Sequence, residues 1–391
     1  MFNSAFYRFL FTSSVLALVS ASPDAELVTR ADCVVDSVSS ASSISSCSAV
    51  TINAFTVANG STLTLSPKSG ATITMAGDVT FAQTSSTGPL FTIDGESITF
   101  KGAGFKFDGN GAKYWDGNGT NGGVDKPHPF LKFKGSWNLL SIHGLEQPLP
   151  KLVSIGNSNG LTFDSITVDN SAGDTNSLGH NTDGFDVSAD NVTIQNSIVK
   201  NQDDCIAINS GSTIIFKNNQ CSGGHGISIG SIATGKTVSG VTISGNTVTN
   251  SMYGLRIKVQ KSATNAKVSG ITYSGNTISG ITKYGVLISQ SYPADDGTPG
   301  TGGPISDVNF TGNATTVQVG TKAKRMTINC GACSGTWDFS KLTITGGSAG
   351  RTNTTDNATV GLLSPVFIEI TNVEVRLSVD RFRMPTNALR F

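Results

Sequence analysis

The sequence predicts an all-β protein whose fold is a right-handed parallel β-helix, a single-domain solenoid over residues 31–350. Three observations predict this fold. Helical periodicity is nearly absent after the first segment. Glycine is frequent, with 45 residues, and Ser, Thr and Asn are abundant, a composition that favours short strands joined by tight turns. A short strand followed by a polar turn also recurs along the chain at a loose period, which is typical of stacked repeats.

The repeat is clearest between residues 191 and 315. Its copies are "NVTIQNSIV" (191–199), "TIIFKNNQC" (213–221), "GVTISGNTV" (240–248), "GITYSGNTI" (270–278) and "DVNFTGNAT" (307–315), with a weaker copy, "GLTFDSITV", at 160–168. Because a single unit cannot bury its own apolar face, the units must stack. We expect side-chain ladders from the turn asparagines, which lie 23, 27, 30 and 37 residues apart at Asn196, Asn219, Asn246, Asn276 and Asn313. The alternative is a β-sandwich or propeller, but the sequence lacks the series of two-residue hairpins that a sandwich would need.

The first residues have the features of a secretory signal peptide, which we place at residues 1–21. Arg8 lies in a short leading region, the apolar stretch "FLFTSSVLALVS" is too short to span a bilayer, and Ala21 ends a small-residue cleavage site. An N-terminal membrane anchor is the alternative. Residues 22–30 would form a propeptide that ends at Arg30. We therefore expect a secreted, extracellular protein that is not held in a membrane.

Six cysteines fit an oxidising compartment. Fifteen connectivities are open, and neighbours in the sequence suggest the pairs Cys33–Cys47, Cys205–Cys221 and Cys330–Cys333. Reduced, buried thiols are the alternative. The CxxC spacing of the last pair also occurs in redox motifs, but no βαβ pattern surrounds it, so we expect a structural loop. Glycosylation is permitted at the sequons of Asn59, Asn118, Asn191, Asn309, Asn313, Asn353 and Asn357.

The last segment, residues 351–391, differs from the rest of the chain. Residues 31–350 contain two arginines, Arg256 and Arg325, whereas this tail contains five, and the Gly-Asn repeat stops before it. We expect the tail to be a terminal cap, a disordered extension or the product of a misread gene end. The formal net charge of the whole chain is zero, so we expect no nucleic-acid partner.

Acidic, imidazole and cationic residues recur at the spacing of one rung of the solenoid. Asp203 lies 20 residues after Asp183 and 22 residues before His225, and Arg256 follows after 31 more. Residues one rung apart in a β-helix lie about 4.8 Å apart. These side chains, together with Asp204, are therefore expected to converge on one face. Two neighbouring acids can both face that side only where a strand meets a turn or bulge, and the "NQ" before them marks such a place.

Crowded carboxylates suit the hydrolysis of a glycosidic bond. Mutual repulsion raises the pKa of at least one carboxyl, so that one can hold a proton while its neighbours stay ionised. Glycoside hydrolysis needs such a proton donor beside a base that activates water. Arg256 and Lys258, on the same side of their strand, would hold a carboxylate of an anionic substrate. We expect neither a metal nor another cofactor.

Each of these residues taken alone also has a structural explanation. The pair Asp203 and Asp204 could form a solvated turn or a set of calcium ligands. Asp183 could be an ordinary loop acid, a lone histidine such as His225 is more often structural, and the two cations could face solvent. The joint alignment at one rung period favours a functional site.

Four short motifs carry these residues: "NTD" (181–183), "QDD" (202–204), "GHG" (224–226) and "RIK" (256–258). In this order they resemble the motifs of secreted fungal polygalacturonases, pectin-degrading enzymes of glycoside hydrolase family 28. The resemblance extends over residues 33–345 and includes "FDGNGAKYWDGNGTNGG" near the start. Tyr292 in "ISQSYPADDG" is a further candidate. The sequence departs from the family's pattern at its end, because no cysteine follows Cys333.

The resemblance implies a right-handed parallel β-helix and hydrolysis with inversion at the anomeric carbon. It implies that Asp203 is the general acid, that Asp183 and Asp204 orient and activate the water, and that His225 tunes the protonation of Asp203. Inverting enzymes usually separate acid and base by about 6.5–9.5 Å, which is more than neighbouring rungs provide. The residues implied to hold galacturonate units are Asn181, Arg256, Lys258 and Tyr292.

We therefore expect a monomeric, endo-acting polygalacturonase that hydrolyses α-1,4 bonds of de-esterified pectin, with polygalacturonate as its partner. Alternatives on the same architecture are an exo-polygalacturonase, a rhamnogalacturonan hydrolase and a calcium-dependent pectate lyase. A lyase needs metal-binding acids and a basic residue, for which Arg256 is available. A non-catalytic carbohydrate-binding or adhesion protein is the alternative outside enzymes, and the full set of acids disfavours it.

Overall fold

The computed structural model describes residues 33–354 and 358–361, except 136, 142–144 and 147–152. These residues all belong to one compact unit that begins at Cys33. The expected signal peptide (1–21) and propeptide (22–30) lie outside the described residues, as does the chain from residue 362 onward. Among the described residues, no helix combines the length and apolar content needed to cross a lipid bilayer.

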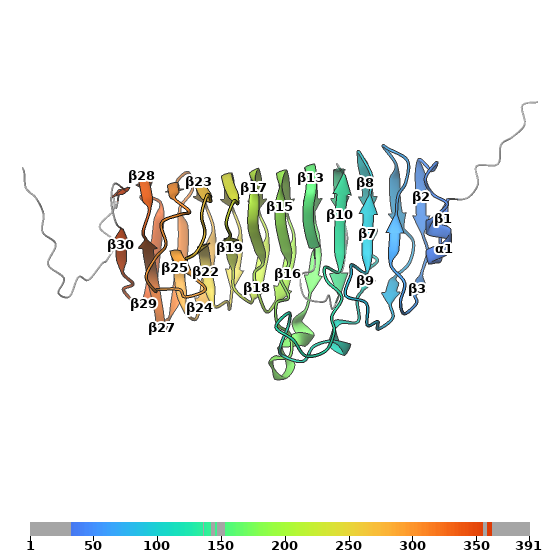
Figure 1. Cartoon of the computed structure of the whole chain (residues 1–391), viewed down its shortest axis with the longest axis horizontal. Helices are drawn as coiled ribbons and strands as arrows, with labels where there is room; N and C mark the ends of the chain where they lie inside the picture. Colours follow the sequence, from blue (N-terminus) through green and yellow to red (C-terminus); the bar gives the residue numbers. More distant parts are fainter. Residues whose placement is uncertain (1–32, 136, 142–144, 147–152, 355–357, 362–391) are drawn as a thin grey trace, which may run out of the picture. The chain divides into compact units, whose positions relative to one another are not determined.

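Nearly all the described secondary structure consists of short parallel strands stacked in chain order (Figure 1). Each turn of the chain contributes a strand to each of three ladders, which we call the first, second and third ladders in the order in which they begin. Strands β13, β15, β17 and β27 bend and contribute to two ladders each. The fold is a right-handed parallel β-helix, as predicted.

The first ladder contains β1 (Val34–Val35), β2 (Ala49–Ile52), β5 (Thr72–Met75), β8 (Ile98–Lys101), β11 (Trp137–Ser141), β13 (Val153–Asp164), β15 (Phe185–Gln195), β17 (Ile206–Lys217), β20 (Thr237–Ser244), β23 (Lys267–Ser274), β26 (Ile305–Phe310), β28 (Cys333–Asp338) and β31 (Ala358–Gly361). The second contains β3 (Phe55–Val57), β6 (Val79–Phe81), β9 (Phe107–Asp108), β12 (Leu145–Glu146), β14 (Thr167–Asp169), β16 (Ile198–Asn201), β18 (Gln220–Gly223), β21 (Thr247–Thr249), β24 (Thr277–Ile281), β27 (Thr315–Cys330) and β29 (Leu342–Ser348). The third contains β4 (Leu63–Leu65), β7 (Phe91–Asp94), β10 (Leu131–Gly135), the leading parts of β13, β15 and β17, then β19 (Ile227–Ile232), β22 (Tyr253–Gln260), β25 (Tyr284–Tyr292), the end of β27 and β30 (Thr352–Thr354). The described helices are α1 (Val38–Ala41) and the 3-10 turns η1 (Gly111–Lys113) and η2 (Ser171–Ser177).

Inward-pointing side chains of the three ladders form one continuous apolar core. In the first ladder, Phe163, Ile194, Phe216 and Ile243 occupy successive rungs in register and are almost fully buried. Burying a side chain of this size contributes about 1.5–3 kcal/mol, and only stacking makes that burial possible. The apolar residues of the repeat therefore specify the inside of the solenoid.

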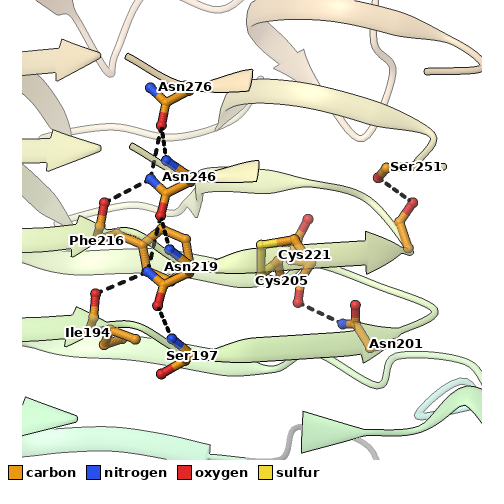
Figure 2. Close-up of a disulfide and its surroundings, with 12 residues drawn as sticks. Ile194, Ser197, Asn201, Cys205, Phe216, Asn219, Cys221, Asn246, Ser251 and Asn276 are labelled. Atoms are coloured by element: carbon orange, nitrogen blue, oxygen red, sulfur yellow. Dashed lines mark hydrogen bonds between the residues drawn. A yellow bond between two sulfur atoms is a disulfide. The ribbon is translucent and has the colours of Figure 1, made fainter. Parts of the chain in front are cut away.

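A ladder of buried asparagines follows the turn between the first and second ladders (Figure 2). We call Asn219, Asn246 and Asn276 the asparagine ladder. Oδ1 of Asn246 accepts from the backbone N and from Nδ2 of Asn219, at 2.9 and 3.1 Å. Nδ2 of Asn246 donates to Oδ1 of Asn276 and to the carbonyl of Phe216, both at 2.9 Å. Each side chain thereby satisfies backbone groups that a buried turn would otherwise leave unpaired.

The predicted asparagine ladder is confirmed at these three positions and is wrong at the two outer ones. Asn196 lies one residue before the ladder position, which Ser197 occupies, and its amide donates to Asp164 instead. At the other end, the backbone N of Asn276 donates to the hydroxyl of Thr315, while Asn313 is exposed. Hydroxyl side chains can therefore replace asparagine where the ladder ends.

The three disulfides join the predicted pairs: Cys33–Cys47, Cys205–Cys221 and Cys330–Cys333. The middle disulfide is buried and links Cys205, the residue directly before β17, to β18, a strand of the second ladder (Figure 2). Cys205 directly follows Asp203 and Asp204, so this bond restrains the corner at which the two acids lie.

The paired strands continue beyond residue 350, where the atypical tail was expected to begin. β30 pairs with β27, and β31 pairs with β28, so described strands reach Gly361. The first residues of the expected tail therefore extend the stack.

Replacing Asn246 with alanine should destabilise the protein strongly, because the change removes hydrogen bonds to Asn219, Asn276 and the carbonyl of Phe216. With several buried bonds at about 1 kcal/mol each, we expect a loss of about 3 kcal/mol in the free energy of unfolding, measured by denaturant titration. The control is Asn313→Ala, compared in deglycosylated material, which should cost less than about 0.5 kcal/mol because the side chain is exposed. Equal losses in the two variants would contradict the importance of the asparagine ladder.

Candidate active site

The candidate active site lies at the corner where the second ladder passes into the third. Successive turns of the chain stack there through backbone hydrogen bonds. The N–H of Gly184 donates to the carbonyl of Asp204 at 2.9 Å, and the N–H of His225 donates to that of Asp203 at 2.8 Å. Nδ2 of Asn201 also donates to the carbonyl of Asp204, at 2.9 Å. The predicted convergence of the acids and the imidazole is thus present in the structure.

Asp204 is the most deeply buried acid of the corner, and its carboxylate forms ion pairs with two positively charged side chains. Its Oδ1 accepts from the hydroxyl of Ser228 at 2.7 Å and from Nη2 of Arg256 at 2.6 Å. Its Oδ2 accepts from Nζ of Lys258, also at 2.6 Å. The side chain of Asp204 is 1% exposed, so burial of this charge depends on the two cationic partners.

Arg256 and Lys258 themselves are buried within the protein. Burial alone would lower the pKa of the Arg256 guanidinium, but the charge and hydrogen bond of Asp204, with Tyr253 and Asp203, together outweigh burial and raise the pKa. The two residues were expected to hold a substrate carboxylate, and the structure places both of them against Asp204. Two positive charges thus face one carboxylate, and the charge of Lys258 also helps to lower the pKa of the neighbouring Asp203.

Asp203 points to different partners from those of Asp204, although the two residues are adjacent. Its Oδ1 is 2.8 Å from Nδ1 of His225 and also accepts from the backbone N of Asp204 at 2.8 Å. Its Oδ2 accepts from Nδ2 of Asn181 at 3.2 Å. Burial raises the pKa of the Asp203 carboxyl, but the hydrogen bond and charge of His225, with the charge of Lys258 and the backbone of Asp204, together lower that pKa to about 2. The Asp203 carboxyl therefore gives up its proton more readily than an ordinary aspartate.

Asp183 has the opposite electrostatic environment. Burial, and after it the negative charges of Asp203, Asp186 and Asp204, raise the pKa of its carboxyl well above the ordinary value. The corner therefore moves the pKa values of Asp183 and Asp203 in opposite directions, the first upward and the second downward. Such a separation is what acid–base catalysis by carboxyl groups requires.

The remaining predicted residues lie around this cluster. Asn181 bridges Asp203 and the loop that contains Thr120, since its Oδ1 accepts from the backbone N and the hydroxyl of Thr120, both at 3.1 Å. Tyr292 is at the end of β25, and Nζ of Lys258 lies 5.4 Å from the centroid of its ring. The structure thus brings all eight predicted site residues to one region of the solenoid.

Sequence reasoning missed Ser228 and Tyr253. Ser228 is in register with Arg256 on the next rung, so continuing the rung count from Arg256 would have found it. Tyr253 lies three residues before Arg256, and its ring centroid is 4.1 Å from Cζ of the guanidinium. The ring also meets His225 edge-on at 5.8 Å. No periodic signal in the sequence distinguishes this tyrosine from a core residue.

A metal ion is a poor fit to this corner. Asp203, Asp204 and His225 each offer a ligand atom within 4.8 Å of the others. Both oxygens of Asp204, however, already face Arg256 and Lys258, whose positive charges would repel a divalent cation. The arrangement is better suited to proton transfer than to calcium binding.

Replacing Asp183 with asparagine should stabilise the fold increasingly as the pH rises. A carboxyl with a raised folded-state pKa contributes stability that is complete below its ordinary value of 3.8 and is lost as the pH rises through the folded value. The asparagine variant has no carboxyl at this position and does not lose this stability. The unfolding free energy of the variant minus that of the wild type should therefore increase from about pH 4 to about pH 7, as measured by urea titration.

Asp164→Asn is the matched control for this experiment. Burial raises the pKa of the Asp164 carboxyl, but hydrogen bonds from Asn196, Gln195 and Ser165 outweigh it and lower the pKa. That variant should therefore lose stability relative to wild type above about pH 4. A difference for Asp183→Asn that does not vary with pH would contradict the assignment of a raised pKa to Asp183.

Comparisons with known proteins agree with this geometry. Among solved structures, endopolygalacturonase I from Stereum purpureum, complexed with two galacturonates, is similar with a TM-score of 0.80 and 63% identity. The match covers 84% of this chain and 100% of that chain. A polygalacturonase from Erwinia carotovora, at 20% identity and a TM-score of 0.57, shares the fold and covers 81% of this chain and 92% of its own.

Curated sequences give the same result. An endo-polygalacturonase from Sclerotinia sclerotiorum is 45% identical over 313 residues, which cover 77% of this chain and 80% of that protein. Endopolygalacturonase B from Emericella nidulans is 43% identical over 342 residues, covering 85% and 92%. The family model for glycosyl hydrolases family 28 matches residues 46–364, which include the whole corner with its acids. The chain therefore belongs to glycosyl hydrolases family 28.

Proposed function

We propose that this protein is an endo-acting polygalacturonase, which hydrolyses α-1,4-galacturonosyl bonds of de-esterified pectin with inversion. The observation that carries the proposal is the corner itself. There the pKa of Asp183 is raised, Asp203 is hydrogen-bonded to His225, and Arg256 and Lys258 supply positive charge beside them. Three proteins that this chain resembles, at 43%, 45% and 63% identity, are named endopolygalacturonases, which supports both the substrate and the endo mode of action.

Asp203 is the proposed general acid, and His225 is its proton store. The 2.8 Å contact between Nδ1 and Oδ1 lets one proton lie on either partner. In the substrate-free protein the hydrogen bond and charge of His225, together with Lys258 and the backbone of Asp204, lower the pKa of Asp203. A bound sugar excludes water from the corner, and a drier environment favours the neutral pair over two separated charges. The proton then lies on Asp203, from which it reaches the leaving oxygen.

Asp183 and Asp204 are the proposed residues that orient and activate the water. Inversion requires that a water attack the anomeric carbon from the face opposite the leaving group. Asp183 can accept a proton from that water only when it is ionised, and its raised pKa makes it a stronger base than an ordinary aspartate. Asp204 contributes a fixed negative charge, which its two cationic partners hold in place.

The substrate is a polyanion, and the positive charge of the corner suits it. Arg256 and Lys258 together exceed the charge of Asp204, so a galacturonate carboxylate can approach them without displacing that acid. Asn181 and Tyr292 would contribute an amide and an aromatic surface to neighbouring sugar units.

Secretion and a monomeric state are parts of the same proposal. Polygalacturonate is an extracellular polymer, and the second and third ladders form a complete corner within one chain.

The first test is the action of the purified protein on polygalacturonate, with and without a chelator. We expect viscosity to fall steeply while few reducing ends have formed, because endo cleavage shortens the polymer from within. Activity should be unchanged by the chelator, because the side chains of Arg256 and Lys258, and not a metal ion, face the oxygens of Asp204. Unsaturated, ultraviolet-absorbing ends together with loss of activity in chelator would indicate a lyase. Sugar release with little loss of viscosity would indicate exo action.

The second test is Asp203→Asn, which preserves the size of the side chain and removes the transferable proton. We expect kcat on polygalacturonate to fall about 100- to 10,000-fold, the range typical of losing a general acid, while calorimetric affinity for oligogalacturonate changes little. Asp164→Asn, which alters a hydrogen-bonded aspartate outside the corner, should retain normal activity. Near-normal turnover in the Asp203 variant would show that another residue is the acid.

A further inference from the structure

The glycine-rich segment "DGNGTNGGVDK" (116–126), which we call the 116–126 loop, reaches the candidate active site from an earlier part of the chain. Figure 1 shows the teal chain around this loop and the green chain around η2 gathered at the same edge of the solenoid. The N–H of Gly117 donates to the carbonyl of Leu178 at 2.9 Å, and Nδ2 of Asn121 lies 3.3 Å from Nε2 of His180. The loop is therefore fastened to the segment that immediately precedes Asn181.

An ion pair between buried Lys126 and half-buried Asp116 gives the loop a fixed shape. Nζ of Lys126 contacts Oδ2 of Asp116 at 2.8 Å and donates to the carbonyls of Gly122 and Val124. Asp116 also accepts from the backbone N–H groups of Asn118 and Val124. The side chain of Lys126 is 4% exposed, so this pair acts as an internal anchor and not as a solvated surface contact.

The anchored loop brings Thr120 onto the side chain of Asn181. The backbone N–H of Thr120 can only donate, so the amide atom that faces it must be the carbonyl oxygen Oδ1. The Thr120 hydroxyl donates to the same oxygen, also at 3.1 Å. With Oδ1 held in this way, the NH₂ group of Asn181 faces Oδ2 of Asp203. The opposite amide orientation would place two oxygens against each other.

Close packing at Gly119 supports the same contact. A β-carbon at this position would lie 2.4 Å from Oδ1 of Asn181 and 2.8 Å from the carbonyl of His180. The backbone of Gly119 also has φ of 57°, in the left-handed region that other residues rarely adopt. Glycine is thus what allows the loop to approach Asn181 closely enough for both hydrogen bonds from Thr120.

We propose that the 116–126 loop positions the catalytic cluster, with Thr120 as the residue that fixes the orientation of the Asn181 amide toward Asp203. Thr120 is a positioning residue, because it acts through Asn181 and does not touch the reacting atoms. The proposal rests on the proposed function for its catalytic meaning, whereas the contact itself is a property of the fold. The proposal explains how Thr120, which is 61 positions before Asn181 in the chain, influences Asp203 through the Asn181 amide.

The test is a double-mutant cycle between Thr120→Val and Asn181→Ala. Valine keeps the shape of threonine and removes the hydroxyl donor. We expect kcat/KM on polygalacturonate to fall about fivefold in the wild-type background, the factor for one lost hydrogen bond, and less than twofold in the Asn181→Ala background. Thr120→Ser, which restores the hydroxyl, should recover most of the loss. Val124→Ala, a change to an exposed side chain of the same loop, should leave activity unchanged.

Two outcomes of this cycle would overturn the proposal. Equal losses in both backgrounds would mean that Thr120 acts independently of Asn181, and no loss in either background would mean that the contact is without consequence. The same four proteins are also compared by their midpoints of urea unfolding, a measurement that needs no substrate. We expect the effects of the two substitutions on this midpoint to be non-additive. A wild-type protein inactive on polygalacturonate would refute the proposed function, and the unfolding cycle would still decide whether Thr120 holds Asn181.

Discussion

The backbone hydrogen bonds between successive corners of the solenoid are the constraint on which the site depends. The N–H groups of Gly184 and His225 each donate to a carbonyl one rung away, and these two bonds set the vertical distance between the acidic segments. Side chains that are 20 or more residues apart in the sequence, such as Asp203 and His225, therefore meet at hydrogen-bond distance. Folding of the whole stack already orders these side chains, so substrate binding does not have to offset the loss of their conformational entropy.

Burial of Asp204 makes the charge balance of the corner strict. Its carboxylate has almost no contact with water and is satisfied by Ser228, Arg256 and Lys258. Removing one member of such a buried group leaves an uncompensated charge, at a typical cost of about 3–5 kcal/mol. The same network maintains positive charge close to the place where a polyanionic substrate would bind. Structural and functional requirements therefore act on the same side chains, and substitutions of Arg256 or Lys258 are expected to affect both stability and affinity.

The sequence was sufficient for properties that depend only on the rung period. Counting residues between Asp183, Asp203 and His225 predicted their convergence, and the apolar positions of the repeat predicted the core. The register within a rung was harder to predict. Asn196 was placed in the asparagine ladder, whereas Ser197 occupies that position, because a shift of one residue reverses the direction in which a side chain points. Arg256 illustrates the same difficulty. Counting residues per rung predicted that Arg256 lies near the acids, but it could not show that the guanidinium faces Asp204.

Contacts made by loops were outside the reach of this reasoning. The rung period relates a residue to its neighbours one turn above and below, and Thr120 meets Asn181 only because the 116–126 loop leaves the stack and returns to it. The glycines of "DGNGTNGG" were visible in the sequence, but their spacing does not state where the loop ends. A solenoid repeats the same backbone at every rung, so the rungs alone would offer a polymer many equivalent corners. Loops that leave the stack make one corner different from the others, and we therefore expect selectivity for substrate length and position to depend on such loops more than on the rungs.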